Sequence, residues 1–259
     1  MAIRKCVVAV PARLQSSRLP NKVLADIGGK SMIQRVLERC RQSRSVEAVV
    51  LCTDSAELKT QAEGWGFPVL MTAESCSSGS ERIASVAPSL MALAWGDANS
   101  VAEDTAVINV QGDQPFIDPA VIDAMVEEFR RQDPAPAVVT PVYGLKPESV
   151  HNPNVVKTLL AHDGRALYFS RSAIPHVRDV SEVDWHQHTT YWGHVGMYGF
   201  RGDVLAAWDQ LPASPLEDLE RLEQLRLIEA GLTIATFPVQ GTSLSVDTAE
   251  QLEQARAMV

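Results

Sequence analysis

The fold of this chain is decided by the stretch CVVAVPARLQSSRLPNK, residues 6–22. Residues 6–10 form a continuous run of small and β-branched apolar residues, which is typical of a buried parallel strand. The run ends at Pro11, and a polar loop follows that carries three cations, Arg13, Arg18 and Lys22. A strand that feeds a cationic loop predicts an α/β protein with an anion site at the end of that strand.

The pattern of an apolar run followed by an amphipathic segment repeats along the first half of the chain. Further strands are expected at 48–52, 68–71 and 106–110, and helices after Ser31 and at 54–63, 79–90 and 118–131. Such alternation with short links predicts a mostly parallel sheet covered by helices on both faces. Ligands of these sheets bind at the carboxyl ends of the strands, so the loops after the strands carry the candidate site.

The alternation loosens from about residue 134, where prolines mark turns. We expect one domain over residues 1–259 with a smaller mixed α/β insertion at about 134–195, serving as a lid or an oligomer interface. Beyond it, leucines at helical spacing predict an amphipathic helix over 215–230. A late strand is expected at 232–237 and a closing helix at 247–258.

Composition excludes several classes of protein. The 259 residues carry a net charge of −9, and residues 1–44 carry +8 of charge, against −17 for the remainder. This distribution favours a local anion site and argues against a nucleic-acid partner. The sequence contains no apolar run near the roughly 20 residues that a membrane helix needs. The four cysteines form no C-x-x-C pair, which indicates reduced thiols in a cytoplasmic protein.

The first loop also excludes two familiar nucleotide sites. It contains neither the G-x-G-x-x-G pattern of dinucleotide-binding folds nor the G-x-x-x-x-G-K-[ST] pattern of P-loop proteins. Two guanidinium groups and an ammonium instead suit a polyphosphate that is held by side chains as well as by backbone. A solvated basic loop is the alternative interpretation.

Two aspartates are candidate metal ligands. Asp113 and Asp247 each follow an apolar stretch that includes a valine, and two carboxylates facing a polyphosphate are a usual way to hold Mg²⁺. Other interpretations stay open at this point, because Asp113 lies in a turn-like Gly-Asp-Gln-Pro and Asp247 is three residues before Glu250, as in a capping box. Ser78-Gly79-Ser80-Glu81-Arg82 opens a helix, either beside a nucleotide or as an ordinary helix start.

Together these segments resemble the 3-deoxy-manno-octulosonate (Kdo) cytidylyltransferases, and the resemblance runs over nearly the whole chain. It is carried by residues 11–22, 111–113, 152–157, 166–171, 194–201, 214–217, 222–226 and 246–248. The resemblance implies a Rossmann-like nucleotidyltransferase fold and a Mg²⁺-assisted transfer of a cytidylyl group from CTP to Kdo, giving CMP-Kdo and pyrophosphate for lipopolysaccharide-type glycans. It also suggests a homodimer.

The resemblance implies roles for particular residues. For catalysis and phosphate binding these are Arg13, Arg18, Lys22, Asp113 and Asp247, of which Asp113 and Asp247 ligate Mg²⁺. For the nucleotide they are Pro11, Ala12, Arg13, Ser78, Gly79, Arg82 and Gln111. For the sugar they are Gln111, Arg171, His194, Tyr198, Glu223 and Gln224.

The chain departs from the family pattern in three places. Gln114 replaces a glutamate, the loop 74–79 lacks the usual histidine, and the stretch 241–246 is longer than usual. The alternatives are a cytidylyltransferase for another 2-keto-3-deoxy acid, of the sialic acid or amino-Kdo type, and a non-catalytic anion- or nucleic-acid-binding protein.

Overall fold

The computed structural model describes residues 2–16, 19–96, 99–241 and 244–259. By their contacts the residues divide into two compact units. Unit 1 comprises residues 1–135, 197–209 and 243–259, and unit 2 comprises residues 136–196 and 210–242. Each unit is described by itself below.

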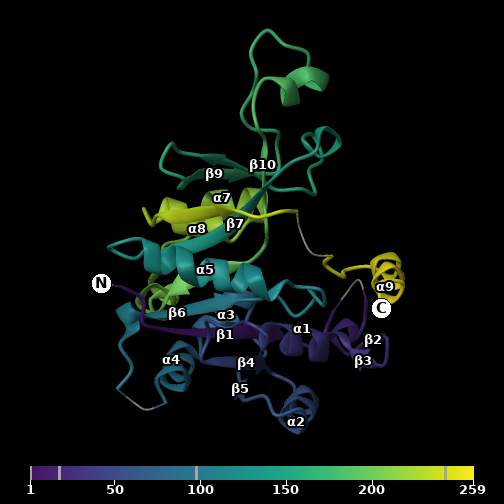
Figure 1. Ribbon diagram of the computed structural model, residues 1–259, viewed down its shortest axis with the longest axis vertical. Helices are drawn as coiled ribbons and strands as arrows, with labels where there is room; N and C mark the ends of the chain where they lie inside the picture. Colours follow the sequence, from purple (N-terminus) through teal and green to yellow (C-terminus); the bar gives the residue numbers. More distant parts are fainter. Residues whose placement is uncertain (1, 17–18, 97–98, 242–243) are drawn as a thin grey trace. The chain divides into compact units, whose positions relative to one another are not determined.

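Unit 1 is built on a sheet with the strand order β5-β4-β1-β6-β11, of which β5, β4, β1 and β6 are labelled in Figure 1. The first four strands are parallel, and β11 runs antiparallel to β6. The bounds are β1 Lys5–Ala12, β4 Ala48–Thr53, β5 Val69–Met71, β6 Thr105–Asn109 and β11 Tyr198–Arg201, with a separate hairpin of β2 Asp26–Ile27 and β3 Lys30–Ser31. Every residue of β1 from Cys6 to Ala12 is buried, so both faces of the sheet are covered, as the apolar run predicts.

Helices of unit 1 pack on these strands: α1 against β1 and β4, α5 against β6, and α3 and α4 against β1. Their bounds are α1 Met32–Cys40, α2 Ala56–Gly64, α3 Gly79–Ala84, α4 Ala87–Trp95, α5 Pro119–Arg131, α6 Gly202–Ala206 and α9 Ala249–Arg256, with 3₁₀ turns η1 Lys22–Leu24 and η2 Ala102–Asp104. Ser31 caps α1 by accepting from the Gln34 N–H. The single helix expected over 79–90 is wrong: Pro88, which has no N–H, lies in the first turn of a second helix, α4.

The strand order of unit 1 creates a point where the chain reverses direction across the sheet. From β1 the chain proceeds to β4 and β5 on one side, and then crosses to β6 on the other side of β1. The carboxyl ends of β1 and β6 therefore lie side by side at this switch point, which is where sheets of this class bind ligands.

Unit 2 contains the strands β12-β7-β10-β8-β9 in that order. An isolated bridge between Arg165 and Ala235 links the beginning of the β9 region back to β12. The bounds are β7 Val138–Gly144, β8 Lys157–Leu160, β9 Ala166–Ser170, β10 Trp192–His194, β12 Ile234–Pro238, α7 Pro215–Glu220 and α8 Gln224–Glu229, with the 3₁₀ turns η3 Pro147–Ser149 and η4 Glu182–Gln187. A further 3₁₀ turn, η5 Trp208–Gln210, includes the last residues of a unit 1 segment and the first residue of a unit 2 segment. A small separate core of Val150, Trp185 and Tyr191 supports the 145–191 segment.

The continuous helix expected over 215–230 is wrong. Arg221 has φ 54° and ends α7, and α8 begins three residues later. Leu219, one of the leucines whose spacing predicted this helix, is 79% exposed. The carbonyl oxygens of Glu220 and Arg221 are bound by the side chain of Arg171, so a contact between distant parts of the sequence accompanies the break.

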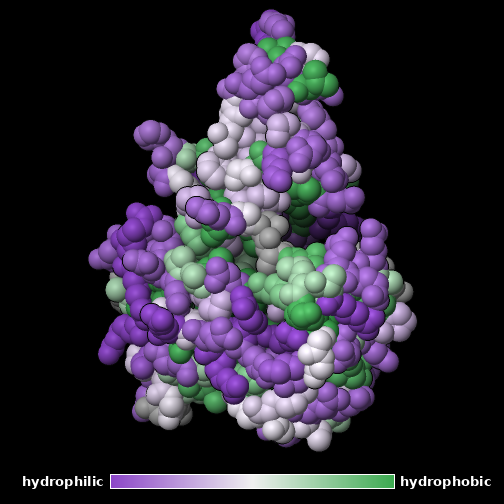
Figure 2. Space-filling view, turned by 45° about the vertical axis from the view of Figure 1, so that its right-hand side comes forward, coloured by the Kyte–Doolittle hydropathy of each residue, from purple (hydrophilic) through white to green (hydrophobic). Residues whose placement is uncertain are grey.

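The surface is mainly hydrophilic on the face shown in Figure 2, where hydrophobic residues form separate patches. Among the described residues, no helix has the length and apolar character needed to cross a bilayer.

Candidate functional site

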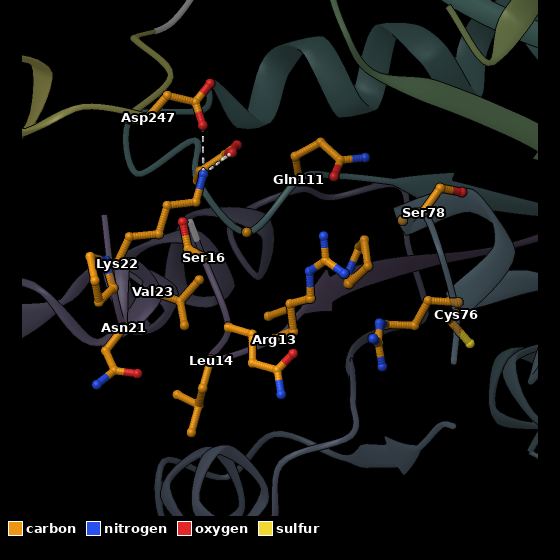
Figure 3. A pocket seen from close by; sticks show the side chains of 18 residues that line it. Arg13, Leu14, Ser16, Asn21, Lys22, Val23, Cys76, Ser78, Gln111 and Asp247 are labelled. Carbon is orange, nitrogen blue, oxygen red and sulfur yellow. Dashed lines mark hydrogen bonds and ion pairs between the residues drawn. The ribbon is translucent and has the colours of Figure 1, made fainter. Parts of the chain in front are cut away.

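A cleft of about 720 Å³ opens at the carboxyl ends of the strands in unit 1. Its walls are the loops after β1, β5 and β6, together with Asp247 from the segment before α9 (Figure 3). The sequence-predicted residues that line it are Pro11, Ala12, Arg13, Lys22, Ser78, Gly79, Arg82, Gln111, Asp113 and Asp247. Arg18 lies outside the described residues.

Two glycines allow the loops around the cleft to approach each other closely. A Cβ atom on Gly79 would lie 3.0 Å from Gln111 Oε1 and 3.1 Å from Pro11 Cγ. On Gly112 it would lie 3.1 Å from the carbonyl oxygen of Pro11. The Ser78 hydroxyl accepts from the Glu81 N–H, which fixes the start of α3 at the wall of the cleft.

Lys22 and the two predicted metal ligands meet at one point in the cleft. Lys22 Nζ lies 2.7 Å from Asp113 Oδ2 and 2.8 Å from Asp247 Oδ1 (Figure 3). Burial acts to lower the pKa of Lys22, but the two carboxylates outweigh it and raise that pKa above its ordinary value. Two carboxylate oxygens from distant parts of the chain therefore converge on a single cation.

The backbone explains why Asp247 reaches this point. The residue that caps α9 is Thr248 and not Asp247: its hydroxyl accepts from the Gln251 N–H, and Gln251 completes the capping box. The side chain of Asp247 is therefore not the helix cap. In addition, the Val246 N–H donates to the carbonyl oxygen of Asp113 at 2.9 Å, which holds the two aspartates side by side.

Arg82 lines the cleft, but its guanidinium is bound by protein groups. The side chain is 3% exposed and forms an ion pair with Asp54 at 2.7 Å. It also donates to Thr72 Oγ1 and to the carbonyl oxygen of Ala73. Arg82 thus ties the loop after β5 to the end of β4, and so shapes the wall formed by Ser78 and Gly79.

The residues predicted to bind the sugar are divided between the two units. Gln111 and Tyr198 belong to unit 1, and Arg171, His194, Glu223 and Gln224 belong to unit 2. In unit 1, Gln111 donates to Asn109 Oδ1 at 3.2 Å, and Tyr198 lies on β11 opposite Asn109.

His194 in unit 2 is a neutral imidazole at physiological pH. Burial lowers its pKa to about 3. Its Nε2 forms a hydrogen bond of 2.9 Å with Thr140 Oγ1, and its ring contacts the Phe169 ring edge-on. His194 therefore offers a hydrogen-bonding group and not a positive charge.

Sequence reasoning missed Cys76, whose side chain is buried at the wall of the cleft beside Ser78. Its position in the loop after the third strand is the signal that points to it. The other cysteines, Cys6, Cys40 and Cys52, are buried in β1, α1 and β4, and burial raises the pKa of each thiol to about 12. Gln114, at a position where the chain departs from the family pattern, is 7% exposed, and its Oε1 has no hydrogen-bond partner among the described residues.

Comparison with known proteins agrees with this arrangement. The family model described as Cytidylyltransferase matches residues 7–234. The chain is 39% identical to the 3-deoxy-manno-octulosonate cytidylyltransferase of Chloroherpeton thalassium and 37% identical to that of Myxococcus xanthus, each over 98% of this chain, and over 98% and 96% of the respective relative.

Solved structures give the same result. A CMP:2-keto-3-deoxy-manno-octonic acid synthetase complexed with CTP superposes with a TM-score of 0.88 at 38% identity, over 98% of both chains. A putative glucose-1-phosphate thymidylyltransferase from Bacillus anthracis, with a TM-score of 0.65 and 14% identity over 98% of this chain and 94% of that one, shares the fold alone. The expected nucleotidyltransferase fold is confirmed.

Proposed function

Because the chain belongs to the 3-deoxy-manno-octulosonate cytidylyltransferase family, we propose that its cleft binds CTP and that the protein transfers the cytidylyl group to Kdo with the help of Mg²⁺. The observation that carries the proposal is the convergence of Asp113 and Asp247 on one cation in a cleft that also contains Arg13. The cleft lies at the switch point of the sheet, where nucleotides bind in this class of fold.

The two aspartates have the donor chemistry that Mg²⁺ requires. Hard carboxylate oxygens suit this ion, which is commonly bound by one or two carboxylates while substrate phosphates and water complete its shell. Among the described residues, no group of three or more His, Cys, Asp and Glu side chains is arranged to hold a metal ion. A pair of carboxylates that shares Mg²⁺ with a nucleotide triphosphate fits this arrangement. The ion, when bound, would polarise the α-phosphate and lower the pKa of the attacking hydroxyl.

In the proposed reaction, the anomeric hydroxyl oxygen of Kdo attacks the α-phosphorus of CTP. A new O–P bond forms, the bond from the α-phosphorus to the bridging oxygen breaks, pyrophosphate leaves, and the hydroxyl proton passes to solvent. Such a displacement needs alignment and charge neutralisation more than covalent help from the protein. Arg13 and Lys22 supply positive charge in the cleft, where the negative charge of the leaving pyrophosphate develops.

For the acceptor, we propose that Arg171, His194, Glu223 and Gln224 of unit 2 contribute to binding of the sugar acid. The homodimeric state and the cytoplasmic location stay predictions. Size-exclusion chromatography with light scattering tests the first, and fractionation of the source cell tests the second.

The proposal is tested by measuring pyrophosphate release with each of the four nucleoside triphosphates, with Kdo present or absent. Release that requires both CTP and Kdo is expected. A parallel series with sialic acid and an amino-substituted Kdo identifies the acceptor, and a strong preference for one of these acids over Kdo would overturn the assignment. No release with any pair would overturn the catalytic proposal itself.

A further inference from the structure

The segment 152–157, which carries part of the family resemblance but no assigned role, contains a fully buried lysine in unit 2. Lys157 begins β8, and its side chain is 0% exposed. Its Nζ donates to the carbonyl oxygens of Asn152 at 2.9 Å, Val155 at 2.6 Å and Arg171. Three carbonyl acceptors match the three hydrogens of one ammonium group, so the buried charge is fully hydrogen-bonded.

Arg171, at the end of β9, continues this network. Its guanidinium donates to the carbonyl oxygens of Glu220 at 2.7 Å, Pro153 at 3.2 Å and Arg221 at 3.4 Å. The Glu220 carboxylate in return accepts from the Arg171 N–H at 2.9 Å and from Ser170 Oγ at 2.6 Å. Two cations and one carboxylate therefore tie together three segments, 152–157, 170–171 and 220–221.

The third of these segments is the break between α7 and α8. Arg221 has the left-handed φ of 54°, and the chain then delivers Glu223 to the start of α8 and Gln224 to a position that is 2% exposed. A non-glycine residue at positive φ persists only where its surroundings hold it. The bonds from Arg171 to Glu220 and Arg221 are such surroundings, and Lys157 in turn holds the backbone of Arg171.

We propose that Lys157 is a positioning residue for acceptor binding, because its bond to the carbonyl oxygen of Arg171 fixes that residue and, through it, the turn that presents Glu223 and Gln224 to the sugar acid. This inference rests on the proposed function, which assigns those three residues to the acceptor. It also revises the role of Arg171, since three N–H groups of its guanidinium hold backbone oxygens.

The test uses Lys157→Met, which keeps the length of the side chain and removes the charge and its hydrogen bonds. The matched control is Lys146→Met, at an exposed lysine of the same unit. We expect the KM for Kdo to rise roughly tenfold to hundredfold, which is about the effect of losing one hydrogen bond between the acceptor and a charged group. The KM for CTP should stay within about twofold, since the CTP cleft belongs to unit 1. An unchanged KM for Kdo, or an equal rise of both KM values, would overturn the inference.

A second measurement needs no activity. Hydrogen exchange of the free protein should become faster in Lys157→Met at both 152–156 and 220–224, whereas Lys146→Met should match the wild type. Faster exchange at 152–156 alone would refute the link from Lys157 to the turn. If Lys157→Met does not fold, Glu220→Gln tests the same link from the other end, with the same split between the two KM values expected. Wild-type turnover of CTP and Kdo is measured first, so that failure of the proposed function is recognised separately.

Discussion

Replacement of Lys22 by methionine is expected to strengthen metal binding to the free protein. In the structure Lys22 Nζ bridges Asp113 and Asp247 at 2.7 and 2.8 Å, and these are the oxygens proposed to ligate Mg²⁺. A metal ion that binds there without CTP has to displace the ammonium group. With CTP bound, the triphosphate offers Lys22 another anion, so metal and lysine no longer compete.

The size of this effect follows from the two ion pairs. A hydrogen bond to a charged group contributes about 1.5–3 kcal/mol, so two of them give about 3–6 kcal/mol before solvent screening. The side chains of Lys22, Asp113 and Asp247 are 15%, 21% and 31% exposed. This exposure to solvent reduces the energy of the two ion pairs toward that of pairs on the surface. If displacing Lys22 costs the metal ion about 2 kcal/mol, the affinity of the free protein for the ion is lowered roughly thirtyfold.

The assay is a titration with Mn²⁺, a spectroscopic substitute for Mg²⁺, monitored by electron paramagnetic resonance in the presence and absence of CTP. Without CTP, Lys22→Met should bind Mn²⁺ about thirtyfold more tightly than the wild type. CTP, whose phosphates ligate the ion in both proteins, should strengthen Mn²⁺ binding more in the wild type than in the variant. Lys59→Met, at a lysine on α2 outside the cleft, is the control and should behave as the wild type. Equal Mn²⁺ affinity of Lys22→Met and wild type without CTP would refute the competition between lysine and metal.

Asp113→Asn should abolish pyrophosphate release while the circular dichroism spectrum and the unfolding midpoint stay close to those of the exposed control Asp209→Asn; an active, Mg²⁺-dependent variant would refute the ligand assignment. The pKa of His194 in the folded protein is about 3, below the ordinary value near 6.5. The unfolded chain therefore takes up a proton at His194 before the folded protein does, so the free energy of unfolding decreases as the pH falls from about 6.5 toward 3. His194→Gln should therefore lose less free energy of unfolding than the wild type between pH 7 and 4.5, and equal losses in urea titrations would contradict this. Asp123 accepts hydrogen bonds from Ser43 Oγ and from the N–H groups of residues 44 and 45. Burial acts to raise the pKa of Asp123, but these hydrogen bonds outweigh it and lower the pKa. The carboxylate therefore stabilises the fold above the ordinary pKa of an aspartate, and this stabilisation is lost as the pH falls through the lowered pKa. Asp123→Ala should lower the free energy of unfolding by about 1–2 kcal/mol at pH 7, and this loss should shrink as the pH falls below the ordinary pKa of an aspartate, as measured by chemical denaturation.

The sequence predicted those parts of the fold that local patterns determine. Seven consecutive residues of β1 are buried, as its apolar sequence predicted. Ser31 caps α1 at the position where a polar residue precedes the apolar residues at helical spacing. The loop after β1 was identified as a candidate anion site from its position and charge, and its described cations Arg13 and Lys22 line the cleft. These signals depend on neighbours within a few residues, which a sequence displays directly.

Errors arose where distant contacts decide the structure. The leucine spacing over 215–230 fits one helix, yet the chain turns left-handed at Arg221, where Arg171 binds the carbonyl oxygens that a continuing helix would bury in its own hydrogen bonds. The sequence likewise did not show that the charge of Arg82 is held by Asp54, a residue 28 positions earlier, while its contact with the nucleotide stays a prediction. Neither partner is visible in the local pattern, because a guanidinium binds the acceptors that folding brings close to it, wherever they lie in the sequence.

The position of Asp247 is fixed by a hydrogen bond between distant parts of the chain and by buried packing of the residue before it. The stretch 241–246 departs from the family pattern, but Val246 is fully buried in a cluster with Ile27 and Met32, and its N–H binds the carbonyl oxygen of Asp113. These anchors act on the last residue before Asp247, so additional residues earlier in the stretch need not move the carboxylate. Thr248 caps α9, so the side chain of Asp247 is not needed for the cap and can take the proposed role of metal ligand. The two aspartates are therefore aligned by the backbone of Val246 and by the cap of the next helix.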